Sequence, residues 1–189
     1  MLTIRPAVLA DLPAICSLYG DIIDFCQTLT ERPGWQREIY PTEGYFREAI
    51  LADTMYVGEL DGALAAGMVV NQKFSDGYRG APWSVRAEDS QVAAIHTLGV
   101  HPRLLRSGVG QQMARGALEL ARERGWLAVR LDVLSKNPAA ARMYEKVGFR
   151  YVSTVNMFYE DTGWADFLLY EYGLEKTVDN GEKPDIIPM

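Results

Sequence analysis

The sequence predicts an α/β fold whose sheet is parallel in the second half of the chain. From residue 92 onward the hydrophobic pattern alternates between strands and helices, which is typical of parallel strands joined by crossover helices. Residues 127–133 form a mostly apolar run, as expected for a strand covered on both faces. The chain has 189 residues, of which 48% are hydrophobic, so one packed domain is expected.

The first half of the chain predicts a strand, two helices and a hairpin. A short strand is expected at residues 2–5. Asp11 is placed to cap a helix, because apolar residues follow it at helical spacing: Leu12, Ile15, Tyr19, Ile22, Ile23 and Cys26. Residues 42–51 predict a second helix. Asp61-Gly62 lies between the apolar runs 55–60 and 63–70, which is typical of a two-residue hairpin turn.

The second half follows a polar loop at residues 74–89. A helix is expected to begin near Val109 and to end at Gly125. Asn137-Pro138 opens another helix that Gly148 ends, since Pro suits the first turn and Gly the position after the last. The expected strands are residues 92–100, 127–133, 149–155 and 167–172. The polar end of the chain, residues 174–189, predicts a flexible tail.

Charge and cysteine content exclude several classes of protein. The net charge of −6 argues against a protein that coats nucleic acid, which needs Lys and Arg to neutralise phosphates. Cys16 and Cys26 lie about 15 Å apart if they share a helix, too far for a disulfide. No apolar run reaches the roughly 20 residues of a membrane span, and the N-terminus does not resemble a signal peptide. We therefore expect a soluble cytoplasmic protein with no nucleic-acid or membrane partner.

The segment from Arg106 to Gly110 predicts an anion site. It enters a helix, whose first backbone N–H groups are unpaired and carry partial positive charge. Residues 101–130 hold six arginines and two glutamates on an otherwise acidic chain. This positive region suggests a small polyanionic ligand. The alternative is that the glycines only permit a tight turn.

A dinucleotide site is the sharper alternative for the same loop. Gly108 and Gly110 resemble the start of a G-x-G-x-x-G motif, and Asp132 follows about 20 residues later at a strand end. The third glycine position is occupied by Met113. The loop also begins well beyond the end of the preceding strand, whereas that motif follows its strand directly.

A second motif favours another family. The segment Asn137-Pro-Ala-Ala140-Ala-Arg-Met-Tyr144-Glu-Lys-Val-Gly-Phe149 fits N-x-x-A-x-x-x-Y-E-K-x-G-F at every fixed position. With the glycine loop, it resembles the GNAT N-acetyltransferase superfamily, in which a loop of form R/Q-x-x-G-x-G/A precedes that motif. The loop departs from the pattern at Leu105, and Arg106 lies one residue later. The resemblance covers residues 1–173 and extends to a W-x-x-x-x-Y-P-T pattern found in uncharacterised bacterial members.

The resemblance implies a single domain over residues 1–173, with a mixed central sheet, two splayed parallel strands and flanking helices. It implies acetyl-CoA as the acyl donor, with the pantetheine arm in the gap between the splayed strands. The pantetheine is then expected along Leu98, Gly99 and Val100, with Asn137 and Ala140 nearby. The backbone amides expected on the pyrophosphate are those of Arg106, Ser107, Gly108, Val109, Gly110 and Gln111. A glycine at position 99 independently suggests a bulge or a close backbone approach.

The resemblance also implies the catalytic groups. The amide of Leu98 is expected to stabilise the oxyanion, and Tyr144 to protonate the leaving thiolate. His96 lies two residues before Leu98, on the same face of a regular strand, and is the candidate base. The alternatives are that Tyr144 is an aromatic anchor, Asn137 an N-cap and His96 a structural histidine. No metal is expected, because two histidines and two cysteines distant in sequence give weak support for a site.

The acceptor pocket is expected in segments 35–45, 78–83 and 156–167. These segments are rich in aromatic residues, and acidic residues lie in or near them: Glu88, Asp89, Glu160 and Asp161. Such residues favour a small cationic amine; the alternative is that the aromatic residues form a small core beneath the loops. The expected reaction is direct attack of the amine on the thioester in a ternary complex, because Cys16 and Cys26 lie far in sequence from the glycine loop. The alternatives are a protein or peptide acceptor, and a binding module that holds CoA without turnover. A homodimer through residues 149–155 or 167–172 is a further expectation, if these are edge strands.

Overall fold

The structure is a computed structural model, which describes residues 1–30 and 32–174. Seven strands form one sheet in the order β1-β2-β3-β4-β5-β7-β6, and all neighbours are antiparallel except β4 and β5. The strands are β1 (Thr3–Pro6), β2 (Met55–Leu60), β3 (Ala63–Asn71), β4 (Val92–Val100), β5 (Ala128–Leu134), β6 (Arg150–Tyr159) and β7 (Gly163–Gly173). The mixed α/β sheet and its parallel pair are as predicted.

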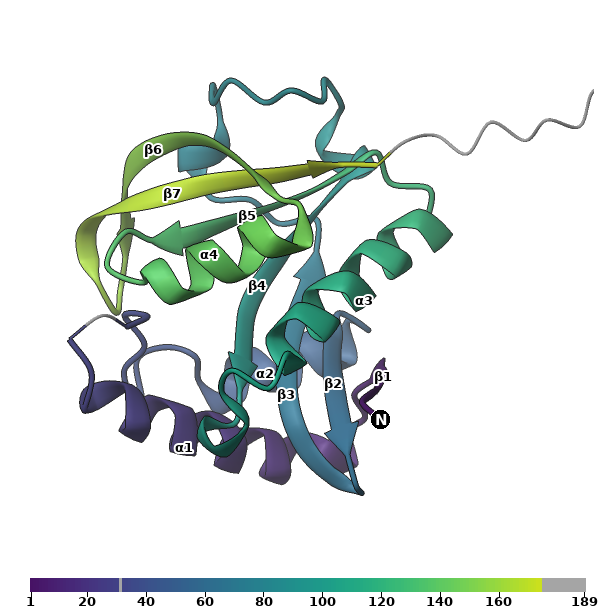
Figure 1. The fold of residues 1–189 in the computed structure, drawn as a ribbon, viewed down its shortest axis with the longest axis vertical. Helices are drawn as coiled ribbons and strands as arrows, with labels where there is room; N and C mark the ends of the chain where they lie inside the picture. Colours follow the sequence, from purple (N-terminus) through teal and green to yellow (C-terminus); the bar gives the residue numbers. More distant parts are fainter. Residues whose placement is uncertain (31, 175–189) are drawn as a thin grey trace, which may run out of the picture.

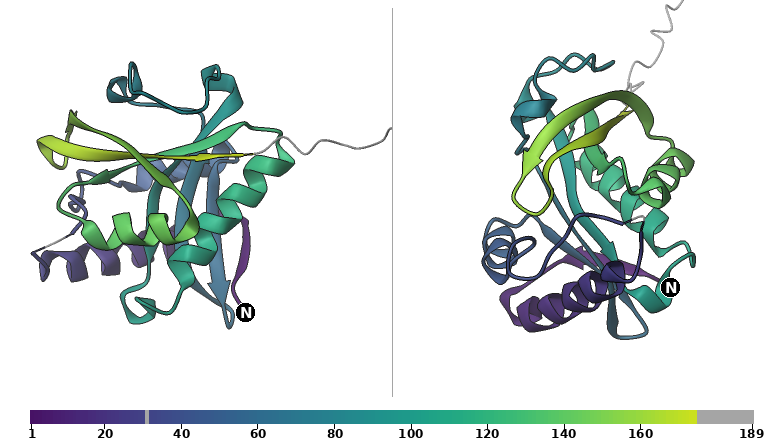
Figure 2. Two further views of the ribbon diagram at one scale, coloured as in Figure 1. Left: turned by 45° about the horizontal axis from the view of Figure 1, so that its top comes forward. Right: turned by 90° about the vertical axis from the view of Figure 1, so that its left-hand side faces the viewer.

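Four helices cover the sheet on two sides (Figure 1). They are α1 (Leu12–Gln27), α2 (Glu43–Leu51), α3 (Val109–Glu123) and α4 (Pro138–Val147). Helices α1 and α2 pack against one face of β2 and β3, whereas α3 and α4 pack against the other face of the sheet (Figure 2). Both faces of the sheet are therefore buried at its centre.

Local sequence signals explain most of these elements. Asp61 and Gly62 both have positive φ, at 52° and 80°, as the predicted hairpin turn requires. Helix α4 begins where the side chain of Asn137 accepts a hydrogen bond from the amide of Ala140 at 3.3 Å, and it ends at Gly148 with φ 110°. The role of Asn137 as an N-cap is thus confirmed. Asp11 precedes α1, but its carboxylate pairs with Arg5 and makes no cap for that helix.

The last two strands differ from the prediction. Strands β6 and β7 form a hairpin that continues to Tyr159 and Gly163, beyond the predicted ends. Strand β7 lies between β5 and β6, so the expectation that residues 167–172 form an edge strand is wrong. Of these two strands, β6 is the one at an edge of the sheet, and a homodimer through β6 stays a prediction. Leu174, at the start of the predicted tail, is buried, and the rest of that tail lies outside the described residues.

Strands β4 and β5 part after a short parallel contact. They pair over three positions only, from Val92 with Ala128 to Ala94 with Arg130. Beyond this point β4 stays paired with β3 as far as Val100, and β5 stays paired with β7 as far as Leu134. The two halves of the sheet therefore diverge, and a wedge opens between them, as the family resemblance implies.

A bulge in β4 changes which residues share a face. The register with β3 shifts between His96 and Gly99, and Thr97 has a φ of 48°. His96 pairs with Val69, which packs on the α1 side, whereas Leu98 packs in the cluster on the α3 side. The expectation that His96 and Leu98 project from one face is therefore wrong. It assumed a regular strand, in which alternate residues point the same way.

Candidate active site

The loop before α3 presents unpaired backbone donors. Gly108 precedes the helix with φ 88°, a conformation that favours glycine, and Arg106 has φ 63°. Within the described residues, no backbone or side-chain acceptor meets the amides of five of the six predicted residues: Arg106, Gly108, Val109, Gly110 and Gln111. The amide of Ser107 differs, since it donates to the carbonyl of Leu104 at 3.3 Å. Five amides are therefore available to an anion.

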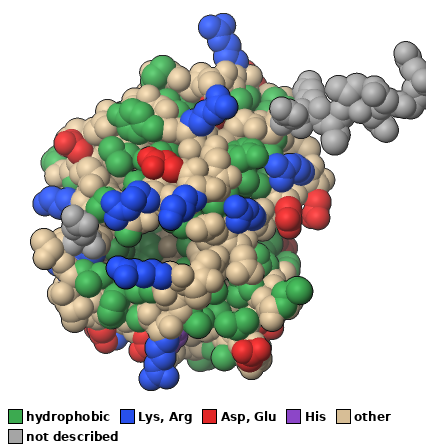
Figure 3. Space-filling view, viewed as in Figure 1, with side chains coloured by type: hydrophobic (Ala, Val, Ile, Leu, Met, Phe, Trp, Pro, Cys, Tyr) green, Lys and Arg blue, Asp and Glu red, His purple; other side chains and the backbone are tan. Residues whose placement is uncertain are grey.

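The positive charge expected around this loop is visible on the surface. Arg103, Arg106, Lys136 and Arg142 are all exposed. The face that carries α3 and α4 is hollowed between α4 and α1, and Lys and Arg side chains lie along the hollow (Figure 3). This end of the wedge suits a polyanionic ligand.

The edge of β4 that faces the wedge also carries free amides. The amide of His101 donates to Ala65 of β3 at 2.8 Å. Because successive amides of a strand point to opposite edges, those of Val100 and Leu98 point away from β3 and toward the wedge. Gly99 faces α1, where an added Cβ would lie 2.9 Å from Ile22 Cδ1. The glycine in this strand thus permits the close approach of α1, and the bulge lies two residues earlier at Thr97.

The wedge ends in a cavity of about 320 Å³, which we call the inner cavity. It receives side chains from both splayed strands, from α4, from the β6–β7 hairpin and from the loop after α1. The predicted residues that line it are His96, Leu98, Asn137, Ala140, Tyr144, Trp35, Tyr40, Tyr159, Glu160 and Asp161. The structure therefore brings the predicted catalytic groups and two of the three predicted acceptor segments to one place.

Tyr144 contributes a buried phenol to the inner cavity. Its ring packs edge-on against Phe149 at 5.4 Å, as expected of an aromatic anchor. Its hydroxyl makes no hydrogen bond with a described residue and is not sealed from the cavity. Burial, followed by the nearby carboxylate of Asp132, raises the pKa of Tyr144. The phenol is therefore protonated at neutral pH and has its proton to give.

Asp132 lies beside Tyr144 and was missed as a residue of this site by the sequence analysis. Its Oδ1 accepts hydrogen bonds from the phenols of Tyr78 at 2.8 Å and Tyr159 at 3.4 Å, and its Oδ2 accepts none from a described residue. Burial raises the pKa of Asp132 above its usual range, although both phenols lower it. The available signal was a carboxylate within the apolar run 127–134, where acidic residues are rare without a role.

His96 has a different environment. Its Nε2 lies 3.0 Å from Oδ1 of Asn71, and that oxygen also accepts from the amide of Lys73 at 2.9 Å. The Nε2 atom must therefore carry the proton, which leaves Nδ1 as the acceptor atom. Burial lowers the pKa of His96 to about 4, so the imidazole is neutral and weakly basic.

Two segments that contact each other border the inner cavity, and we call them the roof: residues 33–36 and the turn at Asp161–Thr162. The side-chain amide of Gln36 donates to the carbonyl of Asp161. Gly34 lies so close to Thr162 that a Cβ on Gly34 would be 2.0 Å from Thr162 Cγ2. On the other side of the roof lies a separate cavity of about 520 Å³, the hairpin cavity, which shares Pro33, Gly34, Leu134, Asp161 and Thr162 with the inner cavity.

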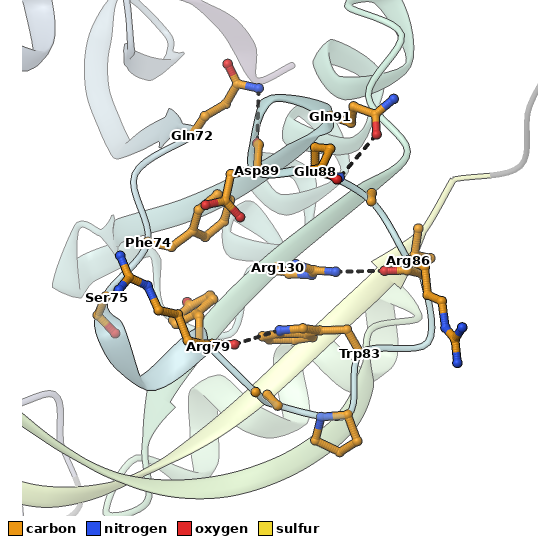
Figure 4. A pocket seen from close by; sticks show the side chains of 16 residues that line it. Gln72, Phe74, Ser75, Arg79, Trp83, Arg86, Glu88, Asp89, Gln91 and Arg130 are labelled. Carbon is orange, nitrogen blue, oxygen red and sulfur yellow. Dashed lines mark hydrogen bonds between the residues drawn. The ribbon is translucent and has the colours of Figure 1, made fainter.

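A third cavity, of about 780 Å³, lies under the loop 72–91, and we call it the loop cavity (Figure 4). Arg130 projects into it, pairs with Glu171 at 3.0 Å and lies 4.3 Å from the centre of the Trp83 ring. The expected acceptor segment 78–83 and the carboxylates of Glu88 and Asp89 line this cavity. None of these residues lines the inner cavity, and Tyr78 is linked to it only by the hydrogen bond from its phenol to Asp132.

Residues 1–30 and 32–174 contain neither a metal-binding cluster nor a membrane-spanning helix. No group of three or more His, Cys, Asp or Glu side chains in this part of the chain is placed to hold a metal ion. None of its helices is long and apolar enough to cross a membrane.

Comparisons of sequence and of fold with known proteins both find acetyltransferases. The family model of the acetyltransferase (GNAT) family matches residues 22–149. The N-alpha-acetyltransferase RimI of Mycobacterium tuberculosis is 30% identical over 124 residues, which are 66% of this chain and 70% of RimI.

Two solved structures share the fold. An acetyltransferase of the GNAT family from Streptococcus agalactiae has a TM-score of 0.78 and 21% identity, over 93% of this chain and 96% of that one. The putative acetyltransferase yncA from Salmonella typhimurium, solved with acetyl-CoA, has a TM-score of 0.69 and 18% identity, over 93% and 95%.

Proposed function

The chain belongs to the acetyltransferase (GNAT) family, and we propose that the amine it acetylates is a small molecule held in the inner cavity. The observation that carries this proposal is the roof. It bounds a space of about 320 Å³ at the end where an acceptor must enter, which suits a small molecule and not an extended peptide.

We propose acetyl-CoA as the donor, which supplies the acetyl group as an activated thioester. The five free amides at Arg106 and residues 108–111 fit its pyrophosphate, because they converge at a helix N-terminus beside exposed basic side chains. The wedge-facing amides of Leu98 and Val100 fit the polar groups of the pantetheine arm. Ala140 and the free side-chain nitrogen of Asn137 border the same space.

The reaction needs one proton acceptor, one proton donor and a hydrogen bond to the acetyl oxygen. Asp132 takes a proton from the incoming ammonium and passes it to water, which leaves a neutral amine. The amine forms the N–C bond as the C–S bond breaks, and the Leu98 amide stabilises the negative charge that develops on oxygen. Tyr144 gives its proton to the sulfur. The nitrogen of the newly formed amide then loses its extra proton, and the phenolate of Tyr144 takes up a proton in its place.

Asp132 and His96 are two candidates for the base. The protein makes the carboxylate of Asp132 more basic than usual and the imidazole of His96 less basic than usual, and Oδ2 of Asp132 is free to accept a proton. We therefore propose Asp132 as the base, and His96 as a neutral side chain of the cavity wall. The role first expected for His96 stays a prediction that the pH profile described in the Discussion tests.

A protein acceptor is the second candidate, because the similarity to RimI favours it. In that case the reacting amine lies in the inner cavity, and the following residues of the peptide pass the roof into the hairpin cavity. A CoA-binding module without turnover is the third, and the unpaired hydroxyl of Tyr144 argues against it. The free thiols of Cys16 and Cys26 fit a cytoplasmic location, where disulfides are rare.

The test is release of CoA thiol from acetyl-CoA with a panel of small amines, amino acids and N-terminal peptides, using the wild type and Tyr144→Phe. We expect release with one class of small amine, and a loss of about 10²–10⁴-fold in Tyr144→Phe. Phe149→Tyr is a matched control, since it adds a hydroxyl to the neighbouring ring. Release with peptides alone would contradict the small acceptor, and an unchanged rate in Tyr144→Phe would contradict its role as the acid.

A further inference from the structure

The inner cavity carries negative charge without a compensating cation. Three carboxylates line it, those of Asp132, Glu160 and Asp161. No Lys or Arg is among its lining residues, and His96 is neutral. A small enclosed space with this charge attracts a cation and repels an anion.

Of these three carboxylates, Asp161 is only 9% exposed and has no function in the proposed reaction. The backbone amides of Asp161 and Thr162 lower its pKa, but no Lys, Arg or His among the described residues forms an ion pair with it. The Gln36 amide bonds its backbone carbonyl instead. Burial raises the pKa of Asp161 above its usual range. A buried carboxylate without a counterion is unfavourable, and a bound cation reduces that penalty.

The two carboxylates come from different parts of the chain that line the inner cavity. Asp132 of β5 lies beside Tyr144, where the acetyl group is transferred in the proposed reaction. Asp161 belongs to the roof and borders both the inner cavity and the hairpin cavity. Trp35, Leu134 and Tyr159 line the same cavity and offer apolar surface that fits a chain of methylene groups.

The chemistry of the reaction explains why a second, protonated amino group on the acceptor would help it to bind. An amine must lose its proton before it attacks, so an ion pair with the reacting amine itself opposes the reaction. A second amino group stays protonated throughout the reaction. A carboxylate that binds this second group contributes affinity without that penalty.

We propose that the acceptor is a small diamine, whose reacting amine lies at Asp132 and Tyr144 and whose second, protonated amino group pairs with Asp161. This rests on the proposed function, since it names the substrate class of the same site.

The test is calorimetric binding to the full chain saturated with CoA, with 1,5-diaminopentane and pentylamine as probes of equal length. We expect the wild type to bind the diamine at least tenfold more tightly than the monoamine. Asp161→Asn should lose this preference and Asp161→Glu should retain part of it. Asp53→Asn, which removes an exposed carboxylate outside all three cavities, should leave the preference unchanged.

Equal affinity of the wild type for the two probes, or a preference that persists in Asp161→Asn, would overturn the proposal. The wild-type comparison does not depend on any variant folding. Turnover is measured separately with the same two amines. Preferential binding of the diamine without turnover of either amine would contradict the proposed function but support the diamine site. Equal turnover and equal binding of the two amines would support the proposed function but contradict the diamine site.

Discussion

Arg130 and Asp132 lie two residues apart on β5, and they show two ways in which a fold treats a buried charge. The guanidinium of Arg130 is paired with Glu171 and stacks on Trp83, and Glu171 also accepts from the amides of Ser84 and Val85. This charge is neutralised and anchors the loop 72–91. Asp132 has only neutral phenols as partners and keeps a free oxygen toward the inner cavity. The comparison teaches that a buried charge without a counterion is the better sign of a reactive site.

The largest effect is expected at Asp132. Asp132→Asn keeps a side-chain oxygen for the two phenols but removes the proton acceptor, so kcat/KM should fall about 10²–10⁴-fold. The free energy of unfolding at pH 7 should stay the same or rise. A carboxyl whose pKa is raised by folding binds its proton more tightly in the folded state, so ionisation at pH 7 opposes folding. Steady-state kinetics and urea unfolding check both parts.

At Glu171 we expect a large loss of stability and a small change in activity, the reverse of the result at Asp132. Glu171→Gln leaves the charge of Arg130 buried and unpaired, which should cost about 3–5 kcal/mol of unfolding free energy. Activity of the folded fraction should change far less than in Asp132→Asn, because Glu171 lines none of the three cavities. Glu119→Gln, an exposed position on α3, should change stability by less than about 0.5 kcal/mol. Equal stability of the two variants would show that the ion pair is not an anchor.

Tyr78 connects the two regions, since its backbone lies in the loop and its phenol bonds Asp132. Tyr78→Phe should destabilise the protein by about 1.5–3 kcal/mol, the contribution of a hydrogen bond to a charged group. Loss of this donor should also move the pKa of Asp132 further upward. Tyr159→Phe removes the longer, 3.4 Å contact and should do less on both counts. A larger loss of unfolding free energy and a larger shift of the pH profile in Tyr159→Phe than in Tyr78→Phe would contradict this prediction.

The smallest effect is expected in the loop before α3, where acetyl-CoA is proposed to bind. Gly108→Ala places a Cβ on a residue with φ 88° and should cost about 1–2 kcal/mol, with weaker binding of acetyl-CoA. Gly110 is the matched control, because an added Cβ there would meet Val100 at an ordinary 3.5 Å. Thermal unfolding with and without acetyl-CoA separates the two variants. Similar losses in both would mean that the conformation of Gly108 does not orient the free amides.

The parts of this molecule that local signals determine were predictable from its sequence. The hairpin at Asp61-Gly62, the cap at Asn137 and the α3 loop each depend on residues adjacent in the chain. The bulge at Thr97 was not predictable, because it is held by distant groups: Tyr19 of α1 donates to its carbonyl, and the hydroxyl of Tyr45 of α2 lies 3.1 Å from its Oγ1. Regular alternation therefore gave the wrong relation between His96 and Leu98.

The role of Asp132 was hidden for a similar reason. From sequence alone it fitted the acidic residue of a dinucleotide site, and its separation from Tyr144 by a turn and a helix gave no sign of contact. The splay of β4 and β5 and the packing of α4 bring the two together. The expected acceptor segment 78–83 lines a different cavity from the other two segments, because the loop folds over Arg130.

The most direct test of the central claim is the pH dependence of kcat/KM with a monoamine, which has no second amino group to bind Asp161, for the wild type, His96→Gln and Asp132→Asn. Below the pKa of the acceptor amine, all three should lose activity with a slope of one, because only the neutral amine reacts. The wild type and His96→Gln should show a second break to a slope of two, at a pH above the usual pKa of an aspartate, and Asp132→Asn should not. A second break that persists in Asp132→Asn and disappears in His96→Gln would contradict the account and assign the base to His96.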